Sequence, residues 1–319
     1  MKMHIDYLRV SVTDRCNLRC IYCHCLDDCD FIDRREILRF EEIRRIVRLF
    51  AECGIRKVRL TGGEPLIRRD VIELIRGLAA VSNIEDLALT TNGVLLEQMA
   101  EQLKAAGLMR VNVSLDSVQR ENYKRITGFD LLGKVMTGIR KAIEVGLSPV
   151  RINAIILRGV NELDVGSLAE LSMEMPVAVR FIEYCPTHKG AVPEEFFVPN
   201  SQVRRSIEDR FGRLAAAVVP NSNGPAVYFK IRGGAGSVGF ISGRTKVFCQ
   251  SCNRLRLTSD GKVMPCLYSA NSYDLKGLIR GGAGDEQILA LLKKIIVEKR
   301  GYTRLNSFTE EFSMRNVGG

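Results

Sequence analysis

Three cysteines near the start of the sequence have a spacing that suits metal chemistry. In "CNLRCIYC", Cys16, Cys20 and Cys23 follow a CxxxCxxC pattern. An iron–sulfur cluster or a structural zinc site usually has four protein ligands. Three thiolates on a four-iron cluster leave one iron open to another molecule, whereas a zinc ion would take His24 or Cys25 as its fourth ligand. The pattern therefore indicates either a cluster with an open iron or a zinc knuckle.

A second group of three cysteines lies toward the C-terminus. Cys249, Cys252 and Cys266 occur in "CQSCNRLRLTSDGKVMPC", and no fourth ligand follows at the spacing of a zinc ribbon. Arg254 and Arg256 alternate on one predicted strand between them. Arginine is a planar donor suited to phosphate or to a purine edge, although two arginines on a strand can also be solvated charge. The group predicts a second three-thiolate site beside an anion-binding face.

The composition limits the class of protein. The chain has 319 residues, of which 46% are hydrophobic and 26% charged, enough for one large domain or two modest ones. The chain has ten cysteines, and all but Cys53 and Cys185 lie in two groups, which favours metal binding. The sequence shows no apolar signal segment and no run long enough to span a bilayer. We therefore expect a cytoplasmic metal-binding protein without a membrane partner. The net charge of +10 is scattered, with no nucleic-acid-binding tail, so it fits an anionic small molecule or a solvated surface.

A repeated helix, glycine and strand pattern organises the first part of the chain. It occurs in "CGIRKVRLTGG", "AGLMRVNVSLD" and "VGLSPVRINAI", where Gly54, Gly107 and Gly146 each end a helix and an apolar residue packs back. With "YLRVSV" from residue 7, "DLALT" from 86 and "AVRFIE" from 178, six strands alternate with helices. Such alternation predicts parallel strands, in an incomplete (β/α)6 TIM-like barrel rather than an open doubly wound sheet.

The alternation is lost from about residue 190, where prolines and glycines become frequent. We therefore expect a partial barrel over residues 1–188 and a C-terminal extension over 189–319 that carries the second cysteine group. Within the extension, Ile288, Leu292 and Ile295 predict a helix near 285–299 whose apolar face belongs to the core.

Small and polar residues follow the predicted strands. The strands run into the first cysteine group, "TGGEP" (61–65), "TTNG" (90–93), "SLD" (114–116) and "EYCP" (183–186). Because catalysis in parallel α/β folds occurs at the carboxyl ends of the strands, these segments predict an active site on one rim.

CxxxCxxC after the first strand and GGEP after the second resemble the radical S-adenosylmethionine (SAM) superfamily. "RFIEY", "CNRLRLTSDGKVMPCL" and the terminal "GG" extend the resemblance, over nearly the whole chain, to the GTP 3′,8-cyclase family of molybdenum cofactor biosynthesis. The resemblance implies a lyase with two [4Fe–4S] clusters and SAM as cofactors. A 5′-deoxyadenosyl radical would abstract a ribose hydrogen from GTP and yield (8S)-3′,8-cyclo-7,8-dihydro-GTP.

The resemblance also assigns residues. The SAM cluster would be held by Cys16, Cys20 and Cys23, and the auxiliary cluster by Cys249, Cys252 and Cys266. SAM would contact Tyr22, Gly63, Ser114 and Cys185. GTP would contact Arg9, Arg59, Thr90, Arg151, Arg254, Leu255 and Arg256, with a catalytic tail of Gly318 and Gly319. Three departures from the family pattern are Arg151 for a lysine, Cys185 for a methionine, and His24-Cys25, with Cys29 beyond, for Met-Pro.

The implied partners are GTP, a flavodoxin- or ferredoxin-like electron donor, and a cyclic pyranopterin monophosphate synthase that accepts the product. A homodimer is expected, and a nucleic-acid partner is not. Two alternatives stay open: a radical SAM peptide-modifying enzyme, and a non-catalytic iron–sulfur or zinc protein. The first usually has more C-terminal cysteines, and the second leaves the polar strand ends unexplained.

Overall fold

The six strands predicted from the sequence form and lie next to one another in one sheet. The computed structural model describes residues 4–23, 31–185, 192–219, 224–246, 248–269, 271–302 and 314–318. The strands are β1 (Tyr7–Ser11), β2 (Lys57–Thr61), β3 (Asp86–Thr91), β4 (Arg110–Ser114), β5 (Val150–Ile155) and β6 (Val177–Ile182). Each pairs in parallel with the next along the chain, which confirms the predicted parallel α/β sheet.

Helices end at the predicted glycines. Gly54, Gly107 and Gly146 have φ values of +100°, +97° and +75°, which favour glycine. The residue after each is buried, and its amide donates back to the helix, as Ile55 N does to the Phe50 carbonyl at 3.0 Å. The helices that they end are α1 (Phe40–Glu52), α3 (Leu96–Ala105) and α5 (Leu132–Glu144).

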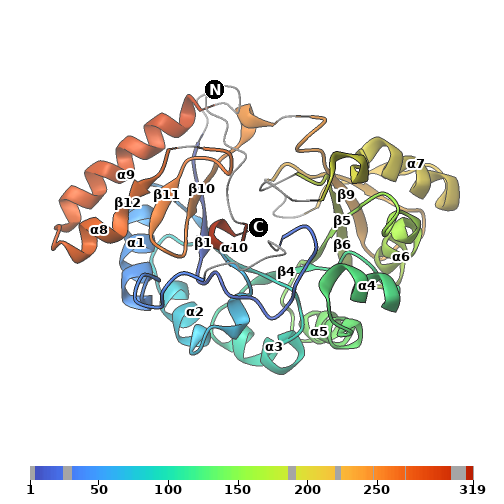
Figure 1. The fold of residues 1–319 in the computed structure, drawn as a ribbon, viewed down its shortest axis with the longest axis horizontal. Coiled ribbons are helices and arrows are strands. Elements are labelled where there is room, and N and C mark those ends of the chain that lie inside the picture. Colours follow the sequence, from blue (N-terminus) through green and yellow to red (C-terminus); the bar gives the residue numbers. More distant parts are fainter. Residues whose placement is uncertain are drawn as a thin grey trace.

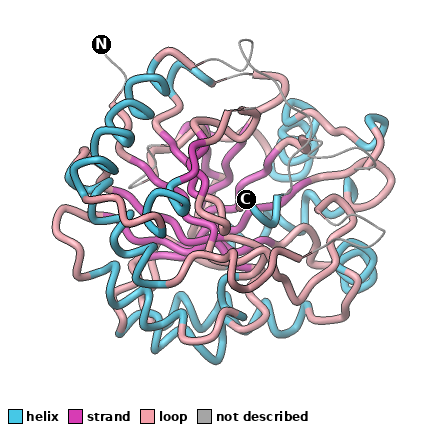
Figure 2. The backbone as a smooth tube through the Cα atoms, turned by 60° about the vertical axis from the view of Figure 1, so that its left-hand side comes forward, coloured by secondary structure: helices cyan, strands magenta, loops and turns pink. Residues whose placement is uncertain are grey.

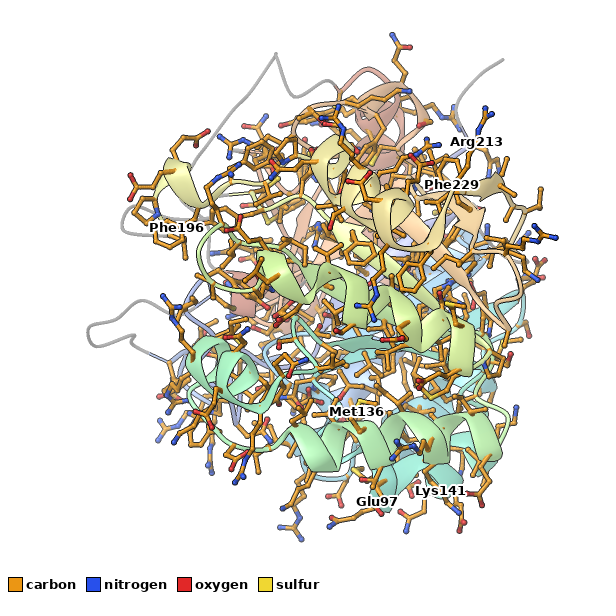
Figure 3. The ribbon with its side chains drawn as sticks, turned by 90° about the vertical axis from the view of Figure 1, so that its right-hand side faces the viewer. Glu97, Met136, Lys141, Phe196, Arg213 and Phe229 are labelled. Atoms are coloured by element: carbon orange, nitrogen blue, oxygen red, sulfur yellow. The ribbon has the colours of Figure 1, made fainter. Side chains whose placement is uncertain are left out.

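Further helices lie, with α1, α3 and α5, on the outer, solvent-facing side of the sheet (Figure 1). They are α2 (Val71–Ala79), α4 (Arg120–Thr127), α6 (Val165–Glu174) and α7 (Asn200–Phe211). On the outer surface, Lys141 of α5 pairs with Glu101 of α3 at 2.6 Å, near the exposed Glu97 (Figure 3). No helix within the described residues has the length and apolar character needed to cross a bilayer.

The C-terminal part of the chain extends the same sheet at both edges, which the sequence did not predict. β9 (Ser237–Ile241) pairs in parallel with β6, and β10 (Arg254–Leu257) pairs in parallel with β1. Short antiparallel strands continue outward: β8 (Val227–Lys230) and β7 (Ala215–Ala216) on one side, β11 (Lys262–Met264) and β12 (Tyr273–Asp274) on the other. The strand order runs from β12 to β7 without closure, so the sheet is open.

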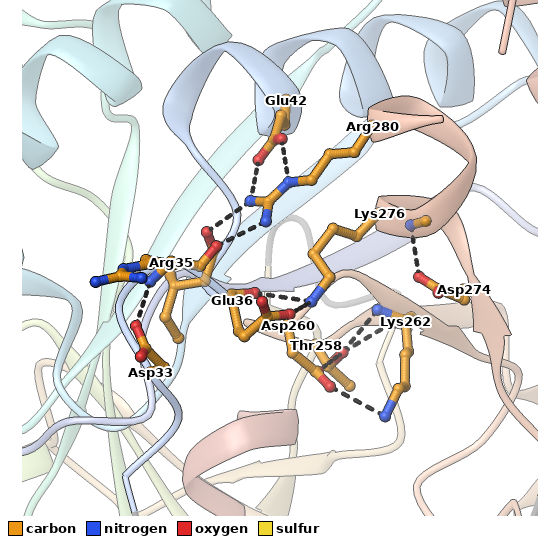
Figure 4. Close-up of polar contacts among 12 residues, drawn as sticks. Asp33, Arg35, Glu36, Glu42, Thr258, Asp260, Lys262, Asp274, Lys276 and Arg280 are labelled. Atoms are coloured by element: carbon orange, nitrogen blue, oxygen red, sulfur yellow. Dashed lines mark hydrogen bonds and ion pairs between the residues drawn. The ribbon is translucent and has the colours of Figure 1, made fainter. Parts of the chain in front are cut away.

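Two C-terminal helices pack beside α1. On α9 (Asp285–Arg300), Ile288, Leu292 and Ile295 are fully buried, which confirms that this helix contributes to the core. On α8 (Leu275–Arg280), Arg280 donates to Glu42 of α1 at 2.8 Å, and Lys276 contacts Glu36 (Figure 4). These contacts fix the segment that joins the first cysteine group to α1.

The last described element lies inside the curve of the sheet. α10 (Met314–Val317) is surrounded by strands in both ribbon views (Figures 1 and 2). Val317 is buried and packs with Met264 of β11. The end of the chain is therefore part of the interior.

Candidate active site

A cavity of about 410 Å³ lies along the inner face of the sheet, from the first residues of strands, such as Tyr7 and Arg110, to the loops that follow their carboxyl ends. It brings together nearly all the residues that the resemblance assigned: Arg9, Cys16, Cys20, Tyr22, Cys23, Arg59, Gly63, Thr90, Ser114, Arg151, Cys185, Cys249, Cys252, Arg254, Arg256 and Cys266. Leu255 does not line the cavity, because its side chain is fully buried in the hydrophobic core on the opposite face of β10. Gly319, His24, Cys25 and Cys29 lie outside the described residues.

The first cysteine group is positioned by the loop that follows β2. The amides of Gly63 and Glu64 donate to the carbonyls of Thr13 and Arg15, each at 2.8 Å. A methyl group on Gly63 would collide with the Arg15 carbonyl, and one on Gly62 with the Thr13 carbonyl. The two glycines of GGEP are therefore required by the close approach of the loop that carries the cysteines.

The far side of the cysteine loop is held by β4 and α4. The amides of Arg19 and Ile21 donate to carbonyls at the end of α4, at 2.9 and 3.0 Å. The Tyr22 hydroxyl donates to Asp116 at 2.5 Å, and Asp116 also accepts the Ile155 amide at 2.8 Å. Burial raises the pKa of Asp116 to about 6. A side chain between the last two cysteines thus anchors the loop to the strand ends.

A second buried carboxylate, Glu64 of GGEP, organises the rim next to Cys16. It accepts the Leu66 amide at 2.9 Å, the Thr91 hydroxyl at 2.8 Å and the Asn92 amide at 2.6 Å. Burial raises the pKa of Glu64 to about 7, although these three donors favour its ionised form. The Asn92 side chain that it positions lies 3.8 Å from the sulfur of Cys16.

The donors near the first cysteine group fit an iron–sulfur cluster. The three thiols are not in disulfides within the described residues and line one cavity, and the Leu18 amide and the Asn92 side chain point N–H groups at the Cys16 sulfur. An all-sulfur set with N–H donors is the environment such clusters have in proteins.

Four arginines form a row across the inner face of neighbouring strands. The register pairs Arg256 of β10 with Arg9 of β1, and Arg9 with Arg59 of β2. Arg59 then pairs with Ala88, and Ala88 with Arg110 of β4. Like charges on adjacent strands repel and destabilise a sheet. The row therefore indicates a site for an anion with several charges.

The row contains more positive charge than the protein neutralises. Within the described residues, Arg110 is the member of the row with a carboxylate partner, Asp86, at 2.8 and 2.5 Å. The buried Nε atoms of Arg9 and Arg59 make no hydrogen bond within the described part of the chain. Burial, with neighbouring arginines, lowers the pKa of Arg59 to about 9 and of Arg256 to about 10, so both stay charged at neutral pH. A chain of phosphate groups would accept hydrogen bonds from these unpaired arginine N–H groups in the cavity.

The second cysteine group has cationic surroundings. Cys249 begins the short helix η4 (Cys249–Ser251), Cys252 follows it, and Cys266 follows β11. Lys299 of α9 lies 3.6 Å from the Cys252 sulfur. Burial alone would raise the pKa of Cys252, but Arg254 and Lys299 outweigh it and lower the pKa to about 6. The three free thiols again form an all-sulfur donor set beside the cavity.

The tail lies against the arginine row. Arg256 donates to the carbonyl of Gly318, and a methyl group at Gly318 would collide with Thr61, another cavity residue. Asn316 accepts a hydrogen bond from Ser259 at 2.6 Å. These contacts place Gly318 beside the cavity, in a left-handed conformation (φ +77°) that favours glycine.

Three cavity cations were missed from the sequence. Arg110 and Arg180 point inward from β4 and β6, and Arg180 donates to Asn112 and Asn153 at 2.8 and 2.5 Å. Strand alternation could have found Arg110, since it lies four residues before the inward Ser114 on β4. It could not have found Arg180, which lies three residues before Glu183 and five before Cys185. Lys299 is the third.

Family comparisons agree with this geometry. The Radical SAM superfamily matches residues 10–172, and Molybdenum Cofactor Synthesis C matches residues 177–305. A curated GTP 3′,8-cyclase from Pelotomaculum thermopropionicum is 43% identical over 99% of this chain and 98% of its own length. A protein of the same name from Moorella thermoacetica is 41% identical over 99% and 98%.

Solved structures share the fold at low identity. SuiB from Streptococcus suis, bound to S-adenosylmethionine, has a TM-score of 0.64 and 15% identity over 92% of this chain and 72% of that one. AnSMEcpe with bound AdoMet has a TM-score of 0.51 and 19% identity over 64% and 60%. The parallel sheet, the cysteine loop after β1 and the profile match define a radical SAM fold. Within that superfamily, the chain belongs to the GTP 3′,8-cyclase family.

Proposed function

We propose that the protein is a GTP 3′,8-cyclase, which converts GTP to (8S)-3′,8-cyclo-7,8-dihydro-GTP in the first step of molybdenum cofactor biosynthesis. Family membership supports this reaction. The observation that carries it is the row of Arg256, Arg9, Arg59 and Arg110, three of them without a carboxylate partner among the described residues. A triphosphate supplies the negative charge that this row requires.

Cys16, Cys20 and Cys23 would hold a [4Fe–4S] cluster, with SAM contacts from Gly63, Ser114, Cys185 and the backbone at Tyr22. When bound, the cluster and SAM supply a 5′-deoxyadenosyl radical that removes a hydrogen atom from the ribose. The protein holds the reacting atoms in place: the Tyr22–Asp116 and Gly63–Thr13 hydrogen bonds fix the cysteine loop. Orientation of this kind can be worth about 7–11 kcal/mol.

Cys249, Cys252 and Cys266 would hold a second [4Fe–4S] cluster next to the nucleotide. The fold then takes the finer description of an incomplete (β/α)6 barrel, residues 1–188, with an extension, 189–319, that carries this cluster. Arg254 supports the assignment, because it lines the same cavity as the three thiols and stacks over the Phe248 ring at 5.3 Å.

Arg9, Arg59, Arg151 and Arg256 would contact GTP together with Thr90, Arg254 and the backbone of Leu255. Arg151 is buried and lines the cavity, which supports a charged contact at this position. Gly318 and Gly319 would form a tail that closes the substrate site, an assignment supported by the Arg256–Gly318 contact. Water exclusion by such a tail would protect a radical reaction.

The remaining expectations concern partners. The reaction would need a flavodoxin- or ferredoxin-like electron donor in the cytoplasm. It would deliver its product to a cyclic pyranopterin monophosphate synthase. A homodimer stays a prediction.

Anaerobic reconstitution tests the proposal. Two clusters correspond to about eight iron atoms per chain. With SAM, GTP and a reductant, the reconstituted protein should form 5′-deoxyadenosine and the cyclised nucleotide in equal amounts. Formation of 5′-deoxyadenosine without any change in GTP would refute the cyclase and leave a radical SAM enzyme with another substrate.

A further inference from the structure

Lys299 occupies a position where the helix pattern calls for an apolar residue. The buried residues Ile288, Leu292 and Ile295 repeat at helical spacing along α9, and Lys299 follows four residues after the last of them. It is accordingly 2% exposed, although lysine is almost never fully buried without a partner. The next residue of this 16-residue helix, Arg300, is exposed. A lysine placed one residue further along the helix would therefore have faced solvent.

A buried ammonium group needs a counter-charge. Within the described residues, no carboxylate forms an ion pair with Lys299; the hydrogen bond that it makes goes to the Cys252 sulfur at 3.6 Å, and it lies 5.6 Å from the centre of the Tyr302 ring. The lysine also lines the cavity. Among the described residues, the group that can supply a negative charge next to Lys299 is the Cys252 thiolate, or a cluster bound to that thiolate.

The Cys16 sulfur of the first group receives N–H groups from the neutral Leu18 amide and Asn92 side chain rather than from a cation. The exposed Arg19 donates to the Cys16 carbonyl at 3.3 Å, and the nearby buried carboxylates are Glu64 and Asp116. Two sites with the same ligand set thus differ in the sign of the adjacent charge. Charge and hydrogen bonds at the sulfurs are among the factors that set the reduction potential of an iron–sulfur cluster.

We propose that Lys299 is a positioning residue for the second cluster: it donates a charged hydrogen bond to Cys252 and raises the reduction potential of the cluster held there. An electron added to that cluster increases its negative charge, and a buried ammonium 3.6 Å from a ligand sulfur stabilises the reduced state. This inference rests on the second cluster of the proposed function.

The test is a redox titration in a Cys16→Ala background, where the second cluster would be the only one. Lys299→Met removes the charge at similar size, Lys299→Arg keeps the charge, and Lys293→Met makes the same substitution at an exposed position of the same helix. Lys299→Met should reduce the ratio of reduced to oxidised cluster about tenfold at a given applied potential. For a one-electron couple this is a shift of about 59 mV to more negative values.

Lys299→Arg should shift the potential less, and Lys293→Met should not shift it. If Lys299→Met instead loses its iron while the other two variants keep about four irons, Lys299 is needed to hold the Cys252 ligand, which supports the contact. An unchanged potential in Lys299→Met with full iron would overturn the inference and leave the second cluster intact. Weaker GTP binding with that unchanged potential would assign Lys299 to the substrate. Absence of iron at the second site in the Cys16→Ala parent would refute the second cluster, and this inference with it.

Discussion

The two cysteine groups line one cavity but have opposite electrostatic surroundings. The group after β1 lies near two buried carboxylates, Glu64 and Asp116. The group around η4 lies near Arg254 and Lys299, and the arginine row begins at its strand. The same thiol ligands are thus placed at an acidic end and at a basic end of one site.

This difference suggests how two molecules of different charge could each bind at a separate end of one cavity. A sulfonium or ammonium group is favoured near the acidic end, whereas phosphates are favoured near the arginines. Under the proposed function, SAM and GTP would take these positions without exchanging them. The predictions below test whether the two ends are independent, from the largest expected effect to the smallest.

Replacing one ligand in each group should separate the two ends most clearly. Cys16→Ala should abolish reductive SAM cleavage, and Cys252→Ala should keep SAM cleavage without substrate while losing GTP cyclisation. Each variant should retain about four of about eight irons, because one of three thiolates is missing at one cluster only. Iron analysis and chromatography of 5′-deoxyadenosine measure this. Cyclisation by both variants would end the two-cluster assignment.

Gly63→Ala should damage the acidic end alone. The new methyl group collides with the Arg15 carbonyl, and overpacking of this kind costs about 1–3 kcal/mol. We expect lower stability in denaturant unfolding and loss of the first cluster, with about four irons kept at the second. Gly133→Ala is a matched control, since nothing lies within 4 Å of that position in α5 and alanine should stabilise the helix by about 0.5–1 kcal/mol. Equal behaviour of both variants would contradict the tight approach of the two loops.

Arginine substitutions should affect the basic end alone. Arg59→Ala and Arg256→Lys should each weaken GTP binding by about 1.5–3 kcal/mol, roughly ten- to a hundredfold, and leave SAM binding unchanged. Lysine at position 256 keeps the charge but lacks the planar fork. Calorimetric titration with GTP and with SAM separates the two ends. The exposed Arg213 (Figure 3) is the control, and its alanine variant should bind GTP within about 0.5 kcal/mol of wild type. Normal GTP binding by the first two variants would remove the substrate site.

Deletion of Gly318 and Gly319 should have the smallest effect on stability. The described contact that it removes at Gly318 is the hydrogen bond from Arg256, worth about 0.5–1.5 kcal/mol. Turnover should fall while both clusters and GTP binding are kept. Unaltered turnover would mean that the tail takes no part in the reaction.

Local rules were sufficient for the first half of the fold. Gly54, Gly107 and Gly146 each combine a helix stop with an apolar residue that packs back, and the strands then follow in order. The pairing of β9 with β6 and of β10 with β1 could not be read in this way. These strands are short and join partners far away in the sequence, so no local signal specifies their register.

Site residues could be predicted from the sequence when their residue type and spacing have few structural roles, as for grouped cysteines. The first cysteine group and GGEP identified one rim, and the structure adds the second cysteine group to the same cavity, a position that the sequence did not predict. Lys299 was overlooked because a lysine in the last turn of a helix ordinarily interacts with the helix dipole in solvent. Arg110 and Arg180 lie on strands where the sequence singled out other residues. Their role depends on neighbours contributed by other strands.

The pairing of β1 with β10 has a consequence for how the protein is made. β1 leaves the ribosome well before β10, because strands are numbered in sequence order. Until β10 has been synthesised, one edge of β1, next to the cysteine loop, is unpaired. One edge of β6 is likewise unpaired until β9 has been synthesised. Unpaired edges favour aggregation during synthesis, and domains that fold late depend more on chaperones. A truncated chain that ends after β6 should therefore be hard to keep in solution, although every strand predicted for the partial barrel would be present.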